Sequence, residues 1–206
     1  MHPRPFLAHA PLMGEPAEQR HRATYADLAA VAPEKVAELI DGELHVFPRP
    51  ASRHARATAR LQRNLGPFDD DDGRPGGWVI LSEPELHFPR LPRPELDVVV
   101  PDLAGFCRER MREMPDVASF TLVPDWICEV LSLSTAAYDR EAKMPLYAQH
   151  GVRWAWLIDP LAQKLEVYEL GRGGRWGAAS IHEKTERVRA VPFEAVELPL
   201  SVLWAR

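Results

Sequence analysis

Three charged residues stand in places where a charge needs a physical reason. Glu129 interrupts the apolar run DWICEVLSL, Asp102 follows the valine-rich run ELDVVVP, and Lys143 belongs to the helix-like stretch YDREAKMPLYAQHG. A carboxylate is costly to bury unless it is paired or binds a metal. Two carboxylates on neighbouring strands can hold one hard divalent cation such as Mg²⁺. Such a cation polarises a phosphate and lowers the pKa of a bound water, and a nearby lysine orients that water or stabilises developing charge.

The elements that must position these residues follow a mixed α/β pattern. Asp41-Gly42 lies between two apolar runs and predicts a β-hairpin. Residues 52–66 are typical of a helix, with Ser52 as its cap and Gly66 as its end. The further predicted elements are strands over 77–88, 95–106 and 125–133, a helix over 138–151 with Pro145 as a kink or late start, a strand pair over 152–170 and small β-ribbons at the C-terminal end. This order predicts a mixed sheet packed between helices.

Several motifs, taken in their order along the chain, resemble one protein family. They are ELIDGEL, RHARATARL, VPDLAGFCRERM, DWICEVLS, YDREAK, PLYAQHGV and WAWLIDP. Together, over roughly residues 24–204, they are similar to the Uma-type restriction endonuclease-like proteins of bacteria, which belong to the PD-(D/E)XK nuclease superfamily. The resemblance implies a mixed sheet with an αβββαβ core flanked by helices, to which we add extra β-hairpins at both ends. It also implies phosphodiester cleavage that depends on Mg²⁺ or Mn²⁺, and pairing of members as homodimers.

The resemblance also implies a set of site residues. Asp102 matches the acid of the "PD" step and Glu129 matches the (D/E) position, so both are expected to be catalytic metal ligands. The sequence then departs from the pattern, because the residue two positions after the glutamate is Leu131 and not lysine. The resemblance suggests that the lysine has moved to the following helix, which makes Lys143 the third catalytic residue. Additional candidates are Glu43, Glu83 or Glu85 as a third carboxylate, and His54 and Asp139 in supporting roles.

A basic stripe runs along the helix predicted over residues 52–66. The spacing of four arginines places them within one arc of the helix, while Ala57, Leu61 and Leu65 form an inward stripe with His54 beside them. Arginine contacts to phosphates give nucleic-acid affinity that does not depend on sequence. We therefore predict DNA binding by this stripe; the alternative is a solvated face paired with local acids. The four arginines are Arg53, Arg56, Arg60 and Arg63.

The composition of the 206 residues limits the remaining possibilities. A net charge of -5 and a pI near 5.9 exclude a basic coat over the whole protein, but they leave room for a local basic groove. Cys107 and Cys128 form no metal spacing and no disulfide framework. No apolar run approaches the roughly 18 residues of a membrane span, and the N-terminus lacks the core of a secretory signal. We expect a cytoplasmic protein with no small-molecule cofactor, a flexible arm over residues 1–23 and a single domain over 24–206.

These observations favour a Mg²⁺-dependent endodeoxyribonuclease and leave two other functions open. The absence of lysine at position 131 is consistent with a nuclease fold that binds nucleic acid or protein without cleaving. A carboxylate pair also permits hydrolysis without metal, for example of sugars. Each site residue has a purely structural interpretation as well: Asp102 as a turn residue, Glu129 as the partner of a buried arginine, and Lys143 as half of a surface pair with Asp139.

Overall fold

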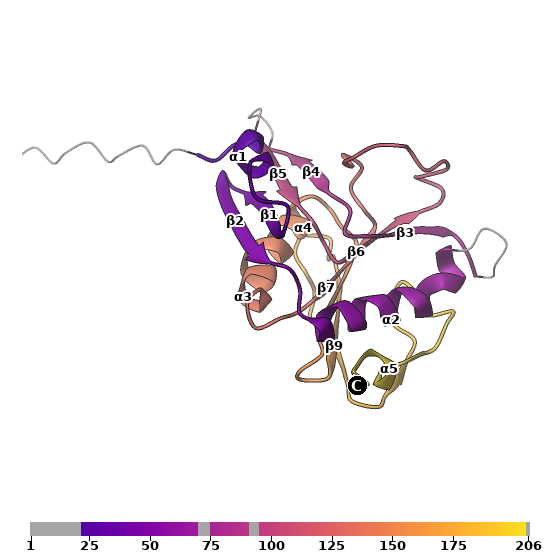
Figure 1. Ribbon diagram of the computed structural model, residues 1–206. Coiled ribbons are helices and arrows are strands. Elements are labelled where there is room, and N and C mark those ends of the chain that lie inside the picture. The colour runs from indigo at the N-terminus through magenta and orange to yellow at the C-terminus, as the bar shows by residue number, and fades with distance from the viewer. Residues whose placement is uncertain (1–21, 70–74, 91–94, 205–206) are drawn as a thin grey trace, which may run out of the picture.

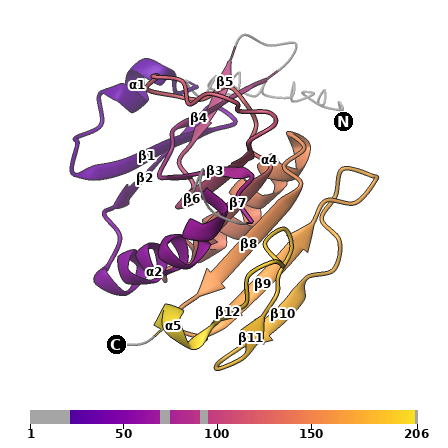
Figure 2. The same ribbon diagram turned by 90° about the vertical axis from the view of Figure 1, so that its right-hand side faces the viewer.

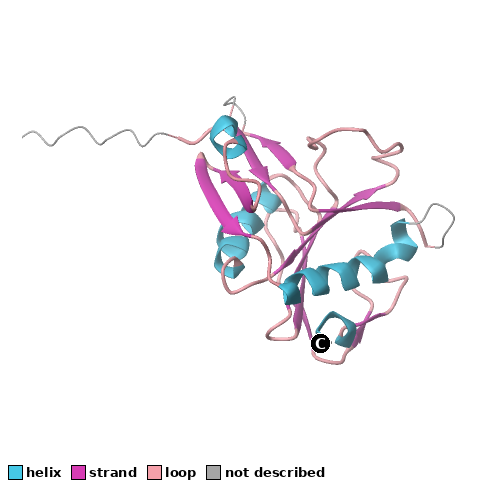
Figure 3. Ribbon diagram, in the orientation of Figure 1, coloured by secondary structure: helices cyan, strands magenta, loops and turns pink. Residues whose placement is uncertain are grey.

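The computed structural model describes residues 22–69, 75–90 and 95–204, so the predicted arm lies almost wholly outside the described residues. The described helices and strands are shown in Figures 1 and 3. The helices are α1 (Tyr25–Ala29), α2 (Ser52–Asp69), α3 (Ala136–Tyr138), the π-helix η1 (Asp139–Lys143), α4 (Met144–Gln149) and α5 (Ser201–Trp204). The strands are β1 (Lys35–Ile40), β2 (Glu43–Pro48), β3 (Trp78–Ser82), β4 (Leu86–Pro89), β5 (Leu96–Val99), β6 (Leu103–Cys107), β7 (Trp126–Val130), β8 (Trp154–Asp159), β9 (Lys164–Glu169), β10 (Ser180–Glu183), β11 (Arg187–Val188) and β12 (Leu198–Pro199). Among the described helices, none has the length and apolar character needed to cross a membrane.

The larger sheet has six strands in the order β10-β9-β8-β7-β6-β3. Its strands β7 and β8 are parallel, and the other neighbours are antiparallel. Helix α2 covers one face and α4 the other, as Figure 2 shows. The predicted αβββαβ core is present and consists, in chain order, of α2, β3, β6, β7, the helical segment α3 to α4, and β8. Antiparallel strand pairs are added at both ends of this core. The predicted fold class is therefore confirmed.

Strand β7 is buried on both faces, as its apolar sequence predicts. Trp126 and Cys128 pack into the cluster that includes α2, whereas Ile127 packs into the cluster on the α4 side. Because successive side chains of a strand point to opposite faces, Glu129 shares the α4 face with Ile127. The carboxylate of Glu129 consequently lies inside the protein, with only 2% of the residue exposed.

The smaller sheet, β2-β1-β5-β4, arises because two predicted strands are each broken in two. Residues 77–88 form β3 and β4, and residues 95–106 form β5 and β6, with the two halves of each run in different sheets. Pro84 and Pro101 lie at the breaks, where a residue without an N–H cannot continue a ladder. The N–H of Glu83 donates to the carbonyl of Asp102 at 3.1 Å, so the breaks lie side by side. Asp102 thus lies at the junction of the two sheets.

Both predicted helices that flank the site differ in detail from expectation. Helix α2 does not end at Gly66 but continues through Pro67 to Asp69. A proline in the last turn removes only one intrahelical hydrogen bond, and burial of Leu65 and Phe68 holds that turn on the sheet. The second helix begins before the predicted residue 138 and contains the π-helical turn η1 directly before α4, in which Pro145 is the second residue. Such turns insert a residue into a helix and are frequent at functional sites.

Candidate active site

A pocket of about 680 Å³ opens where the two sheets meet. Its lining comes from the β1–β2 hairpin, the first turn of α2, the break between β5 and β6, the end of β7 and the helical segment α3 to η1. Asp102, Glu129 and Lys143, which are distant in sequence, all belong to this lining. The structure therefore brings the three predicted catalytic residues to one place.

The Glu129 carboxylate is held through one of its two oxygens. Oε1 accepts a hydrogen bond of 2.6 Å from the Tyr147 hydroxyl, and the Lys143 ammonium lies 2.8 Å from the same oxygen. Among the residues that the structure describes, none donates a hydrogen bond to Oε2 of Glu129. Glu129 is thus paired with a buried lysine and not with an arginine, and it keeps one oxygen for a further partner.

Lys143 is buried, with 3% of the residue exposed, and its three N–H donors all have acceptors nearby. Besides Glu129, the ammonium lies 2.9 Å from Glu38 Oε1 and donates to the carbonyl of Val100 at 3.2 Å. Glu38 Oε1 also accepts the N–H of Val100 at 2.7 Å, so strand β1 is tied to the same point. Asp139 is more distant, at 4.0 Å, and the pair is buried rather than on the surface.

This cluster holds more carboxyl groups than cations. Glu38, Glu129 and Asp139 share the one ammonium of Lys143. Burial lowers the pKa of Lys143, but the charges of Glu129 and Glu38 outweigh burial and hold that pKa above its ordinary value, so the lysine stays protonated. Burial raises the pKa of Glu129 despite the opposing effect of Lys143, and raises that of Asp139 to about 6. A further cation would relieve this excess of acid.

Asp102 is fixed by the two elements on either side of it. Its Oδ2 accepts the N–H of Val130 at 2.7 Å and lies 3.1 Å from His54 Nε2. Burial lowers the pKa of His54, but the hydrogen bond and charge of Asp102 outweigh burial and raise it above its ordinary value. Leu103 pairs with Cys128 at the end of the antiparallel β6–β7 ladder, so Asp102 and Glu129 are the next two residues that face each other. Among the residues that the structure describes, none donates a hydrogen bond to Oδ1 of Asp102.

The other predicted carboxylates are placed unequally. Glu43 is exposed on β2 and does not belong to the pocket lining, whereas Glu83 and Glu85 both do. Glu85 Oε1 is already engaged, because it accepts from the Tyr25 hydroxyl at 3.0 Å and lies 2.7 Å from His87 Nε2.

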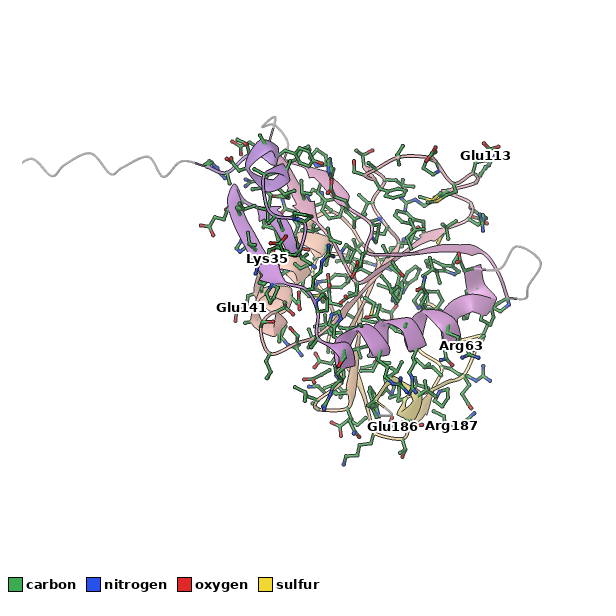
Figure 4. All side chains as sticks on the ribbon, in the orientation of Figure 1. Lys35, Arg63, Glu113, Glu141, Glu186 and Arg187 are labelled. Atoms are coloured by element: carbon green, nitrogen blue, oxygen red, sulfur yellow. The ribbon has the colours of Figure 1, made fainter. Side chains whose placement is uncertain are left out.

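The predicted arginine stripe lies along α2, as Figure 4 shows for Arg63. Arg53 and Arg63 are exposed, and Arg53 also lines the pocket. Arg56 is exposed on the same helix. Arg60 is half-buried, because its guanidinium donates to the carbonyl of Val202 and ties α2 to α5.

Two residues of the site were not predicted from the sequence. Glu38 lies in the run KVAELI, and Tyr147 lies in the helix that follows Lys143. The sequence does contain a signal for Glu38. Val36, Glu38 and Ile40 lie on one face of the strand because side chains alternate with period two. An acid between two apolar residues on one face is also the pattern that indicated Glu129. Tyr147 has a weaker signal, its position four residues after Lys143 on the same helix.

The donor set fits a hard divalent cation held by few protein ligands. Within the described ranges no group of three or more His, Cys, Asp or Glu side chains has the arrangement of a preformed metal site. Mg²⁺ does not need one, because it is usually bound through one or two carboxylates and keeps several waters. Among the residues that the structure describes, none donates to Glu129 Oε2 or to Asp102 Oδ1, and the buried Nδ1 of His54 in the same lining has no hydrogen-bond partner. These groups leave a polar space for an ion and its waters.

Comparison with known proteins agrees with this geometry. Residues 22–202 match the model of the Uma2 family, which is described as "Putative restriction endonuclease". The chain belongs to the Uma2 family. Among solved structures, this Uma2 chain is similar to "a putative nuclease belonging to DUF820" from Anabaena variabilis ATCC 29413, with a TM-score of 0.70, 20% sequence identity, and coverage of 88% of this chain and 97% of that one. No curated protein matches the chain. Family and fold together support a nuclease.

Proposed function

We propose that this chain is an endonuclease that hydrolyses phosphodiester bonds of DNA with the help of Mg²⁺ or Mn²⁺. The observation that carries the proposal is the pair of carboxylates at the β6–β7 edge, Asp102 and Glu129. Each has one oxygen engaged by the protein and one to which no described residue donates. When bound between them, the cation would polarise the phosphate and make an attacking water more acidic.

The residues around the carboxylates hold them in place. Lys143 and Tyr147 fix Oε1 of Glu129, and the Val130 N–H with His54 fixes Oδ2 of Asp102. Lys143 is protonated and its donors already have acceptors, so it acts as a fixed positive charge beside the reacting phosphate and not as the base that takes a proton from water. This role differs from that of a lysine free to orient the water.

The approach of DNA is assigned to the arginines at the start of α2. Arg53 lies in the pocket lining and Arg63 continues the exposed basic face away from it. Contacts of this kind fix the position of a phosphate backbone without reading its sequence. A homodimer and a cytoplasmic location complete the proposal, and light scattering of the purified protein tests the first of them.

A cleavage assay tests the proposal. The purified protein is incubated with labelled DNA in Mg²⁺, in Mn²⁺ and in chelator, and compared with Glu129→Gln and Asp102→Asn, which keep the side-chain shapes. We expect metal-dependent cleavage that falls by about 10²–10³-fold in both variants, because each loses a charged oxygen ligand of the cation that stabilises the transition state. The matched control is Glu141→Gln, at the exposed residue of η1 labelled in Figure 4, which should cleave like the wild type.

Each alternative function has its own outcome in this assay. Absence of cleavage with any DNA in either metal, together with salt-sensitive DNA binding, contradicts the enzyme and favours the binding module. Activity that survives chelator removes the metal from the account and favours hydrolysis by a carboxylate pair. Wild-type rates in Asp102→Asn would show that the assigned site is wrong.

A further inference from the structure

The reacting groups lie at the bottom of the pocket and not on an open surface. Glu129 and Lys143 are 2% and 3% exposed, so a phosphate must enter the pocket to reach them. A volume of about 680 Å³ is of the size that takes small molecules, which in general occupy about 300–1,000 Å³. An unpaired strand can be drawn into a pocket of this volume, whereas a base-paired duplex is too wide to enter it and must first be opened, which costs free energy.

The mouth of the pocket carries exposed apolar side chains. Leu133 is 93% exposed and Leu161 is 54% exposed, and both belong to the lining together with the half-buried Phe47. Leu133 and Leu161 are brought together by the parallel strands β7 and β8, because Val130 pairs with Ile158 and each leucine comes three residues after its member of that pair. Exposed apolar residues that gather in one patch with a polar rim mark an interaction site.

The charge at the mouth has the opposite sign to the charge at the bottom. The exposed charged residues of the lining are Lys35, Arg49, Arg53 and the acid Glu83, so cations predominate. Figure 4 shows Lys35 on the β1–β2 hairpin, on the other side of the molecule from Arg63. A cationic rim beside apolar and aromatic faces is the combination by which proteins bind unpaired nucleic-acid strands: phosphates meet the cations and bases pack on the apolar faces.

We infer that this pocket takes DNA as an unpaired strand, with the bases next to the scissile phosphate packed on Leu133, Leu161 and Phe47. The inference rests on the proposed nuclease function and specifies its substrate. The cations at the pocket mouth bind the flanking phosphates, while Asp102 and Glu129 at the bottom bind the metal. A duplex is a substrate only where it is opened, as at a bubble or a frayed end.

Three labelled substrates of one sequence test the inference with the full chain in Mn²⁺: a single strand, a perfect duplex, and a duplex with a central unpaired bubble. We expect kcat/KM to be at least about tenfold higher for the single strand and the bubble than for the perfect duplex, since only the perfect duplex must be opened first. Binding is measured separately by fluorescence anisotropy with Ca²⁺ in place of Mn²⁺.

Matched variants locate the effect at the pocket mouth. Leu133→Ser and Leu161→Ser should each weaken single-strand binding by about tenfold, through loss of apolar surface buried by the bases, and leave the affinity for Mn²⁺ unchanged. Ile181→Ser is the control, because Ile181 on β10 is 56% exposed, like Leu161, and lies outside the pocket lining. All three positions are on the surface, so thermal denaturation should show folded proteins.

The outcomes distinguish failure of the single-strand preference from failure of the proposed nuclease function. Cleavage of the perfect duplex as fast as the single strand overturns the inference and leaves the nuclease in place. Tight single-strand binding without any cleavage supports the pocket mouth as assigned and overturns the nuclease. Equal loss of binding in Leu161→Ser and Ile181→Ser overturns the role of the apolar mouth.

Discussion

Two ion clusters lie on either side of the helical turn η1, and their charges are balanced differently. In the outer cluster, Arg140 donates two hydrogen bonds of 2.8 Å to Glu166, and Lys164 lies 2.7 Å from the same carboxylate. The hydrogen bonds from Arg140 outweigh burial and lower the pKa of Glu166 to about 2. In the inner cluster one cation, Lys143, serves three carboxylates, and burial raises the pKa of Glu129.

The comparison separates ion pairs that serve the fold from ion pairs that serve a ligand. The outer carboxylate has more cationic partners than it needs, and its oxygens are occupied. The inner cluster has more carboxyl groups than cations, and no described residue donates to Oε2 of Glu129, a costly arrangement for a protein interior. Natural proteins retain such costs mainly at functional sites. The predictions below change one charge in each cluster.

Removal of the shared cation should have the largest effect. Lys143→Met leaves three buried carboxylates without their ammonium, and breaking a buried ion pair on one side costs about 3–5 kcal/mol of unfolding free energy. Urea denaturation measures this loss, and saturating Mn²⁺ should restore part of it by binding the native carboxylates. The matched control is Lys164→Met, for which we expect at most about 1 kcal/mol, because Arg140 still neutralises Glu166. Equal losses in the two variants would remove the distinction between the clusters.

Glu38→Gln should have an intermediate effect, on cleavage rather than on stability. The amide oxygen still accepts the Val100 N–H, but the charge that helps hold Lys143 is lost. Loss of a residue that orients a metal ligand or its partner typically costs about 10–100-fold in activity, measured here as the initial cleavage rate at saturating DNA and Mn²⁺. Glu34→Gln, an exposed residue just before β1, serves as the control. Cleavage at the wild-type rate would show that Glu38 only joins the two sheets.

The smallest effect is expected in the outer cluster. Glu166→Gln should lower the unfolding free energy at neutral pH by about 1 kcal/mol, since its cationic partners are partly exposed. The pKa of Glu166 is lowered from 4.5 to about 2 on folding, so its contribution is present above pH 4.5 and is lost as the pH falls from 4.5 toward 2. The variant should therefore lose less stability than the wild type across that interval, in thermal denaturation followed at several pH values. A cleavage rate unlike that of the wild type would contradict the assignment of this cluster to the fold alone.

The parts of the site that follow from local patterns could be predicted from the sequence. Asp102 and Glu129 stand beside apolar runs, and the order of the motifs gave the αβββαβ core, which the structure bears out. The fold places Lys143 next to Glu129, although the catalytic role of Lys143 stays a prediction. These residues share one property: each is a charge where the local sequence otherwise calls for burial.

The parts that depend on tertiary contacts could not be predicted in the same way. The division of residues 77–88 and 95–106 between two sheets depends on which strands they meet, although Pro84 and Pro101 are local signals for a break. Glu38 reaches Lys143 only because β1 packs beside β5. The π-helical turn that places Asp139 and Lys143 inward and Arg140 toward Glu166 has no recognisable sequence pattern here.

Anomalous diffraction from crystals soaked in Mn²⁺ tests the central claim most directly. If the acid excess of the inner cluster exists to hold a divalent ion, a peak should appear between Oδ1 of Asp102 and Oε2 of Glu129, and it should vanish in Glu129→Gln. A map with no peak there, or one in which Mn²⁺ binds at the outer cluster around Glu166 instead, would contradict the account.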